Sequence, residues 1–342
     1  MFASSLSASH HRPVPAKPLP DIALKIAAAI LLVACLALVS LFVGVSDISP
    51  LALFGQGGDS QAAQIMLASR IPRTAAIMLA GVSMAVAGTI MQMMARNRFV
   101  EPSTVGTVDS ASLGILAVTL VAPETPIFVR MLVASVFALA GTAMFLRILR
   151  SIPLRSVLMV PLVGILFGNI IGAVAAFIAY RFELLQALNA WTTGDFSGVL
   201  RGRYELLWVS FFLAALAYVT ADRFTAAGLG EDFTTNLGLD YRRVLRLGLV
   251  IVAMVTAGVV ATVGMIPFVG LVVPNIVAMV LGDNVRRSLP WVAILGAALL
   301  LACDITGRII RYPYEIPVGT IMGVVGSAFF LVLLLRRRRQ LG

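Results

Sequence analysis

Long apolar runs separated by short charged loops are the feature that most constrains how this chain can fold. The first run extends from Ile22 to Val45, and several later runs reach about 18 residues or more with hardly a charge. Such a run crosses a bilayer as one helix, because a helix satisfies its own backbone in lipid. Charged residues make up 12% of the 342 residues, about half the share of a soluble domain. The sequence therefore predicts an all-α, polytopic membrane protein.

The apolar runs predict about ten transmembrane helices. The first run is too long for the apolar part of a signal peptide, and no small-residue cleavage pattern follows it, so it is expected to be retained. A membrane domain over 22–335 would lie between an N-terminal tail, 1–21, and a basic C-terminal tail, 336–342. The predicted helices cover 22–45, 70–94, 104–121, 127–149, 157–180, 204–222, 244–264, 267–282, 289–307 and 316–335.

The distribution of basic residues predicts that both termini are cytoplasmic. With the N-terminus inside, the inner segments hold 18 of the 26 lysines and arginines, including the terminal run Arg336–Arg339. Loop topology therefore explains the net charge of +10, and nucleic acid is not expected as a partner. The outward-facing basic residues are Arg70, Arg73, Arg130, Arg181, Arg201, Arg203, Arg308 and Arg311.

Four of these arginines lie at the mouths of apolar runs. The segment ASRIPRTAAIML, residues 68–79, contains Arg70 and Arg73, while Arg308 and Arg311 lie at the end of the ninth predicted helix. Two interpretations are open for them. Their side chains extend to the lipid headgroups as anchors, or they form a partly exposed cationic rim that docks an acidic partner or an anionic ligand.

Two predicted helices carry glycines at intervals of three or four residues. Such a face allows another helix to approach to backbone contact. The neighbour is either another helix of this chain, or the glycines line a subunit interface or a passage. The glycines are Gly164, Gly168 and Gly172 in the fifth helix, and Gly319, Gly323 and Gly326 in the tenth.

Several absences narrow the function. The sequence has no Gly-x-x-x-x-Gly-Lys-Ser/Thr motif, so this chain is not expected to hydrolyse ATP through a P-loop. Both histidines lie in the N-terminal tail and both cysteines in apolar runs, so neither a metal site nor a disulfide framework is expected. Asp109 and Asp304 are the main acids inside spans, which is few for an ion-coupled transporter, and internal hydrogen bonding is favoured for them over a place beside a passage.

The largest predicted cytoplasmic loop, 223–243, is the other polar feature. A break is expected at Gly228–Leu229–Gly230, followed by a short helix that starts with the acids Glu231 and Asp232 and ends at Gly238. Phe233 and Leu237 would share one face of this helix. The helix is either a plain connector or a docking surface for a cytoplasmic engine.

Five segments, in this order, resemble the permease subunits of ABC importers for iron–siderophore complexes and cobalamin. The resemblance extends from about residue 64 to 335 and implies ten helices per subunit in a bacterial cytoplasmic (inner) membrane. The segments are RIPRTAAIMLAGVSMAVAGTIMQ, NRFVEPSTVGTVDSASLG, GLGEDFTTNLGLDYRRV, GMIPFVGLVVPNIV and YEIPVGTIMGVVGSAFFLVLLL.

The resemblance also implies partners and residue roles. The partners would be a second, non-identical permease, two cytoplasmic ATPases that use ATP and Mg²⁺, and a substrate-binding protein, while this chain would bind no cofactor. Arg70, Arg73 and Arg308 would engage glutamates of the binding protein, with Arg311 as a nearby extra charge. Coupling to the ATPases would involve Gly228, Leu229, Gly230, Glu231, Phe233, Leu237, Gly238 and Leu239.

Three positions depart from the family's usual pattern. Arg98 replaces a proline, Ser103 a glycine and Asn275 a histidine. These departures favour a ferric-siderophore branch, with catecholate siderophores, over the cobalamin importers. The expected function is to move ferric-siderophore complexes from a periplasmic or surface binding protein through the permease into the cytoplasm, and membrane lipid is expected to surround the helices. A cobalamin or haem importer of the same family, an ion-coupled secondary transporter and a channel-like subunit are the alternatives.

Overall fold

The computed structural model describes residues 19–44, 60–151, 159–282 and 284–338, and all regular elements within these ranges are helices. The predicted all-α class is therefore confirmed. The predicted tails, 1–21 and 336–342, lie for the most part outside the described residues, and so does the start of the predicted helix 157–180.

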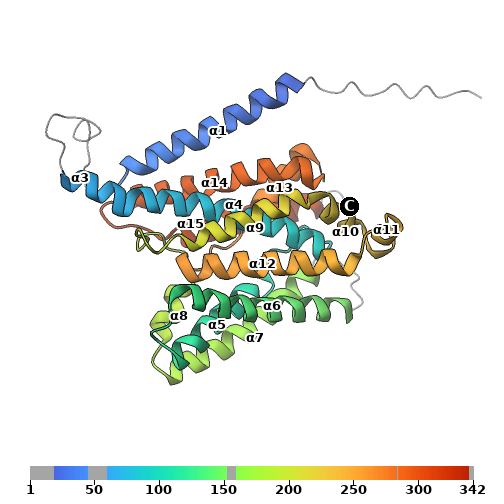
Figure 1. Ribbon diagram of the computed structural model, residues 1–342, viewed down its shortest axis with the longest axis horizontal. Coiled ribbons are helices and arrows are strands. Elements are labelled where there is room, and N and C mark those ends of the chain that lie inside the picture. Colours follow the sequence, from blue (N-terminus) through green and yellow to red (C-terminus); the bar gives the residue numbers. More distant parts are fainter. Residues whose placement is uncertain (1–18, 45–59, 152–158, 283, 339–342) are drawn as a thin grey trace, which may run out of the picture.

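The helices lie roughly side by side along the long axis of one bundle (Figure 1). The long helices are α1 (Leu19–Phe42), α4 (Ile71–Met94), α6 (Ile127–Ser151), α7 (Met159–Arg181), α12 (Tyr241–Val263), α14 (Val285–Ile310) and α15 (Val318–Arg338). The shorter elements are α3 (Ser60–Ile65), the π-helical turn η1 (Met66–Arg70), the 3₁₀ turn η2 (Pro102–Thr104), α5 (Thr107–Val121), α8 (Leu185–Trp191), α9 (Leu206–Val219), α10 (Ala221–Leu229), α11 (Glu231–Asn236) and α13 (Val269–Leu281).

Seven helices of the described chain are long and apolar enough to cross a membrane. There are eight if α9 and α10, which meet at a 66° bend, form one broken span. A helix lies in each of the ten predicted ranges, but α5 has 15 residues and α13 has 13, fewer than the roughly 20 that one crossing requires. Helix length alone thus does not confirm ten complete spans.

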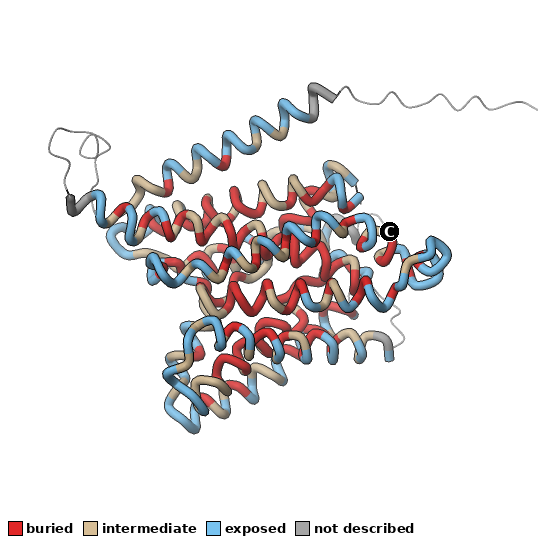
Figure 2. Tube along the Cα trace, in the orientation of Figure 1, coloured by how far each residue is buried: buried red, intermediate tan, exposed pale blue. Residues whose placement is uncertain are grey.

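The centre of the bundle is α4. In the most apolar stretch of Ala63–Met94, which includes α4, 83% is buried inside the protein, whereas the corresponding share in α1 is 11%. Figure 2 shows the same contrast between the central helices and α1. Paired glycines bring backbones together here. A side chain on Gly81 would collide with the backbone of Gly296, and one on Gly88 with that of Gly270, so α14 and α13 pack directly on α4.

Two helices begin inside the bundle rather than at its surface. After α4 the chain turns back through 95–106 before α5 starts, and after α12 it passes through 264–268 before α13 starts. The inner parts of these connections are deeply placed, because Val100 and Val105 are fully buried and Ile266 is 1% exposed, whereas Arg96 and Arg98 near the start of the first connection are exposed. The middle of the bundle therefore contains non-helical backbone that needs partners.

The two ends of the bundle differ. One end carries α3 and α8 and is called the α8 end, while the other carries α10 and α11 and is called the α11 end (Figure 1). The segments predicted to dock a binding protein and those predicted to couple to ATPases lie at opposite ends.

Candidate transport site and docking surfaces

A buried network of arginines and carboxylates joins α4 to α14 at the α8 end. Asp304 on α14 is fully buried and pairs with Arg308 one turn later and with Arg73 of α4, whose Nη2 lies 2.8 Å from Oδ1. Arg73 also pairs with Glu315, with Nη1 2.7 Å from Oε2. The expected internal bonding of Asp304 is thus confirmed. We call Arg70, Arg73, Arg308, Asp304 and Glu315 the arginine network.

The same arginines satisfy carbonyls at the end of α1. The last carbonyls of a helix have no intrahelical donor. Arg308 Nη1 donates to the carbonyls of Ser40 and Val43, at 2.8 and 2.7 Å, and Arg70 Nη1 donates to that of Leu41 at 2.7 Å. A cation is also favourable beside the negative end of the helix dipole. The arginine network therefore fastens α1 to the bundle by its C-terminal end.

This burial corrects the expectation of a partly exposed cationic rim. Arg70 is 7% exposed, Arg308 is 6% exposed, and the Arg73 side chain is 12% exposed. Of the four arginines, Arg311 alone is exposed, and its guanidinium lies 5.9 Å from the ring centre of Tyr314. Carbonyls and carboxylates from distant segments surround the other three. Their docking role stays a prediction.

At the α11 end, α10 and α11 form a tight corner. Gly230, with a φ of +123°, separates the two helices, and the buried Thr234 donates to the carbonyl of Ala226 at 2.9 Å. The predicted short helix from Glu231 is confirmed, and Gly238, with a φ of +76°, follows it. The predicted break is wrong for Gly228 and Leu229, which continue α10, because Gly230 alone adopts the reversing conformation.

Three apolar side chains are exposed at this corner. Leu229, Phe233 and Leu237 are 64%, 47% and 57% exposed, and we call them the coupling surface. Leu239 is half-buried beside them, and its N–H donates to the carbonyl of Thr234 at 3.1 Å. Large apolar groups gathered at an exposed corner are typical of a protein–protein contact.

The corner rests on α4 and on the start of α12. Gly228 packs on the Met93 sulfur of α4, and Arg96 Nη2 donates to the hydroxyl of Tyr241 at 3.2 Å. The side chain of Asp240 accepts the Arg243 N–H at 3.0 Å, which caps α12 and lowers the pKa of Asp240. Any displacement of the coupling surface therefore acts directly on the end of α4.

A carboxylate inside the bundle joins the two helices that begin there. Glu101 is fully buried and accepts the N–H of Phe268, the residue before α13, at 2.7 Å, as well as the hydroxyl of Ser103. Its own N–H donates to Thr104 Oγ1 at 3.2 Å. A negative charge is favourable at the positive N-terminal end of α13. Sequence reasoning missed Glu101, although an acid next to a proline in the middle of the membrane domain was an available signal.

Two further side chains form hydrogen bonds between the same segments. Asn275 of α13 donates to the carbonyl of Arg98 at 2.8 Å, and Gln92 of α4 donates to the carbonyl of Gly270 at 3.1 Å. We call Glu101, Ser103, Phe268 and the Asn275–Arg98 pair the half-helix junction. All three departures from the family pattern, at Arg98, Ser103 and Asn275, belong to this junction.

A depression of about 300 Å³ lies beside the junction, between α7 and α15. Asp109 is half-buried in its wall, so the expectation of internal bonding is not supported for Asp109 as it is for Asp304. The lining residues are Phe99, Ser103, Thr104, Asp109, Pro161, Gly164, Ile165, Gly168, Asn169, Met265, Pro267, Phe268, Leu271 and Phe330.

The glycines of α7 and α15 mainly serve packing within this chain. Gly164 faces the carbonyl of Thr104, Gly168 and Gly172 face Asp109, Gly319 faces Gly194, and Gly323 faces Pro267. Gly164 and Gly168 also border the depression. The opposite faces of α7 and α15 expose large apolar side chains such as Leu166, Ile170, Phe177, Leu331 and Leu335.

Among the described residues, no group of three or more His, Cys, Asp or Glu side chains is arranged to hold a metal ion. The candidate site thus has three parts: the arginine network at the α8 end, the apolar coupling surface at the α11 end, and the depression with the half-helix junction between them.

These features are those of a multi-pass membrane permease. Residues 30–336 match the FecCD transport family, and the chain belongs to this family, as its motifs predicted. Its predicted location, as a multi-pass protein of a bacterial cytoplasmic (inner) membrane, is confirmed by the family and by the apolar helices.

Two proteins are similar to this chain in sequence, and one solved structure is similar to it in fold. The chain is 50% identical over 308 residues to the petrobactin import system permease protein YclN of Bacillus subtilis (strain 168), covering 90% of this chain and 97% of that protein. It is 42% identical over 311 residues to the petrobactin import system permease protein FatD of Bacillus anthracis, covering 91% of each. Its fold is similar to a metal-chelate type ABC transporter solved in an inward-facing conformation, with a TM-score of 0.77 and 22% identity over 93% of this chain and 99% of that chain.

The arginine network predicts a contrast between two neighbouring arginines. Arg308→Gln removes the donors to the end of α1 and leaves buried partners unpaired, so we expect a loss of stability of about 3–5 kcal/mol. Arg311→Gln, at an exposed position, should change stability by less than about 0.5 kcal/mol. Thermal unfolding and membrane abundance of the two variants measure the difference. Equal stabilities would show that the network does not hold α1.

The half-helix junction predicts a graded series at Glu101. Glu101→Gln keeps an oxygen that accepts the Phe268 N–H, so most of the wild-type stability and transport should remain. Glu101→Ala leaves that buried N–H without a partner, which costs about 1–3 kcal/mol and should also slow transport. Unfolding temperature and transport rate are measured for both. Equal losses in Gln and Ala would contradict a hydrogen-bonding role for this side chain.

Proposed function

We propose that this chain is the permease subunit of an ATP-driven importer that moves ferric siderophores into the cytoplasm, with ferric petrobactin as the first cargo to test. The observation that carries this proposal is that the chain is 50% identical to a petrobactin import permease and covers 97% of that protein's length. A cobalamin or haem importer of the same family is the second candidate. An ion-coupled transporter is disfavoured by the scarcity of acids in the spans.

The chain would cross the membrane ten times, with both termini in the cytoplasm. The 13 residues of α13 rise about 20 Å, short of the roughly 30 Å of a hydrocarbon core. The non-helical residues 264–268 before α13 would supply the remaining length. The segment 95–106 extends α5 in the same manner. The α11 end would then face the cytoplasm and the α8 end the outside, in keeping with the distribution of arginines.

A second permease, expected to be a non-identical homologue, would cover the apolar faces of α7 and α15. These faces expose large side chains that lipid or another protein must cover. The depression between α7 and α15 would then open onto a passage shared by the two subunits. Membrane lipid would contact the remaining apolar surface, including α1.

Two cytoplasmic ATPases would bind the coupling surface and use ATP and Mg²⁺, while this chain binds no cofactor. Closure of the ATPases would move α11, and Gly228 and Arg96 would pass the displacement to the end of α4 and the start of α12. The half-helix junction lies further along α4, next to the depression. This route links nucleotide hydrolysis to the opening of the passage.

A loaded binding protein would dock at the α8 end. Of the four arginines predicted to dock it, Arg311 is the exposed one, and it would steer an acidic partner into place. The Glu315 side chain is 24% exposed and pairs with Arg73, so a glutamate of the binding protein would exchange with Glu315 on that guanidinium. Arg70 and Arg308 would contribute by holding α1 and Asp304 in place.

The coupling surface predicts loss of ATPase coupling when a charge is placed on it. We expect Phe233→Asp to abolish assembly with the ATPases, because a carboxylate is costly to bury in an apolar contact. Thr235→Asp, on the same helix and also exposed, is the matched control. The effect is measured by co-purification of the ATPases and by ATP hydrolysis stimulated by the loaded binding protein. Equal behaviour of the two variants would place the contact elsewhere.

Uptake of iron-55 tests the cargo. Cells that lack this chain but retain its partner subunits should lose uptake of ferric petrobactin and regain it when the chain is supplied. Inactive ATPases should abolish uptake even when the proton gradient is intact. Undiminished uptake of ferric petrobactin without this chain, combined with lost uptake of cobalamin or haem, would favour the second candidate.

A further inference from the structure

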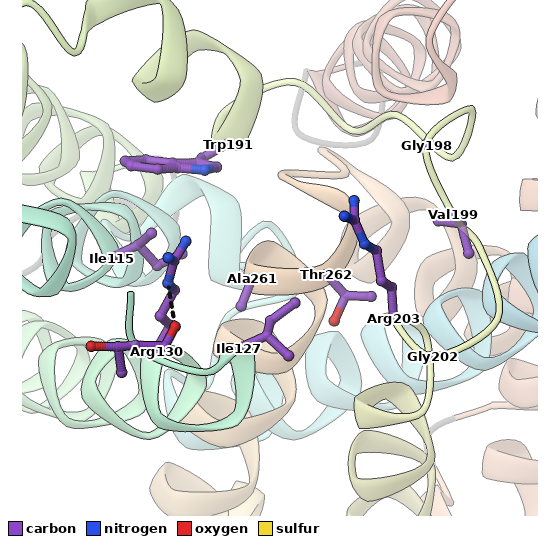
Figure 3. A pocket seen from close by; sticks show the side chains of 11 residues that line it. Ile115, Ile127, Arg130, Trp191, Gly198, Val199, Gly202, Arg203, Ala261 and Thr262 are labelled. Carbon is purple, nitrogen blue, oxygen red and sulfur yellow. Dashed lines mark hydrogen bonds between the residues drawn. The ribbon is translucent and has the colours of Figure 1, made fainter. Parts of the chain in front are cut away.

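A cavity of about 570 Å³ lies at the α8 end, within a single chain and apart from the α7–α15 depression (Figure 3). We call it the arginine pocket. Its walls come from α5, the turn after α5, α6, the end of α8, the segment before α9, and the end of α12. The lining residues are Ile115, Thr125, Ile127, Arg130, Trp191, Gly198, Val199, Gly202, Arg203, Ala261 and Thr262.

The charges of the pocket have one sign. Two arginines line it, and none of its lining residues is acidic. Arg130 is held in place by the turn after α5, because Nε donates to the carbonyl of Thr125 at 3.0 Å and Nη2 donates to that of Pro123. Since a guanidinium has five N–H donors, three of them are left for a ligand.

The second arginine is available for a ligand. Arg203 is exposed, and its guanidinium has no hydrogen-bond or ion-pair partner among the residues that the structure describes. The turn that carries Arg203 is itself ordered, because the Gly202 N–H donates to Glu205 Oε1 at 2.8 Å. The same segment is joined to η1 by the Arg201 N–H, which donates to the carbonyl of Ala68 at 3.0 Å. The pocket is thus built on elements that reach the arginine network.

Figure 3 shows how these groups are arranged. The two guanidinium groups lie on either side of the cavity, with Ile127 and Ala261 between them, and the indole of Trp191 lies over the side that carries Arg130. One compact anion between two guanidiniums would need them close together. Separated cations with an aromatic and apolar surface between them suit a broad ligand that carries several oxyanions.

We propose that the arginine pocket binds an anionic metal chelate with catecholate or carboxylate donor oxygens, before the chelate enters the passage. The volume falls within the range of about 300–1,000 Å³ that is usual for small-molecule sites. Guanidinium groups bind catecholate and carboxylate oxygens through paired, charge-assisted hydrogen bonds, and the indole stacks on a flat ring. The proposal rests on the proposed function, because it needs a chelate cargo that arrives at the α8 end.

The test uses the complete complex, with the second permease and the ATPases, in nanodiscs of phosphatidylcholine. Trp208→Phe and Trp291→Phe leave Trp191 as the single tryptophan of this chain. An anionic ferric tris-catecholate should quench Trp191 saturably, whereas a neutral ferric trihydroxamate should not. Arg203→Gln should weaken the anionic chelate about tenfold or more, as expected for the loss of a charge-assisted contact. Arg201→Gln, an exposed neighbour that does not line the cavity, should leave binding unchanged.

Arg203 is exposed, so its substitution should not disturb folding, and Arg203→Lys should restore part of the affinity. Equal quenching by the two chelates, or equal affinity in the Arg203 and Arg201 variants, would overturn the proposal. Quenching that disappears when phosphatidylglycerol replaces part of the phosphatidylcholine would assign the pocket to an anionic lipid headgroup and overturn it as well. Transport of ferric petrobactin by the same complex is measured in parallel. Transport without quenching refutes the pocket alone, whereas the absence of transport refutes the proposed function.

Discussion

Backbone groups that leave a helix inside a bilayer must find partners within the protein, because lipid offers none. In this chain the constraint falls on the inner parts of two connections, 95–106, whose one regular element is the short turn η2, and 264–268. Side chains of the protein supply the hydrogen-bond partners that these connections need. Glu101 accepts an amide of the second connection, and Asn275 donates to a carbonyl of the first. Each of these bonds also joins two elements, so the groups that satisfy the backbone determine where α5 and α13 begin.

The central helix α4 connects the sites that this arrangement creates. Met93, in its last turn, touches Gly228 of the coupling corner, while Gly88 packs on Gly270 of α13. Arg73, in its first turn, belongs to the arginine network at the opposite end. Close-packed interiors transmit displacement rather than absorbing it. A largely buried helix that touches both ends and the junction is therefore suited to couple docking, passage and nucleotide hydrolysis.

The sequence predicted the parts of this structure that local pattern determines. Apolar runs located the helices, and the acids at Glu231 with the glycine at Gly238 located α11. Pattern could not reveal pairings between distant segments. Arg73 meets Asp304 and Glu315, which follow 231 and 242 residues later, so the arginines appeared exposed although they are buried. In the same way, an apolar run does not show that its helix begins halfway through the bundle, nor which carboxylate caps it.

Burial of the arginine network limits how the α8 end can receive a partner. Arg70 and Arg308 are buried and already donate to carbonyls at the end of α1, so a second protein would have to compete with those carbonyls, and removal of one member leaves a charge without compensation in a dry environment. Glu315 is more accessible, because its side chain is 24% exposed, so in the proposed docking water or another carboxylate would approach as Glu315 leaves Arg73. Exchange of one carboxylate for another preserves the charge balance around Arg73 throughout. Docking would then reach the first turn of α4 without breaking the bonds that hold α1, and the same rigid helix would carry the signal to the coupling corner.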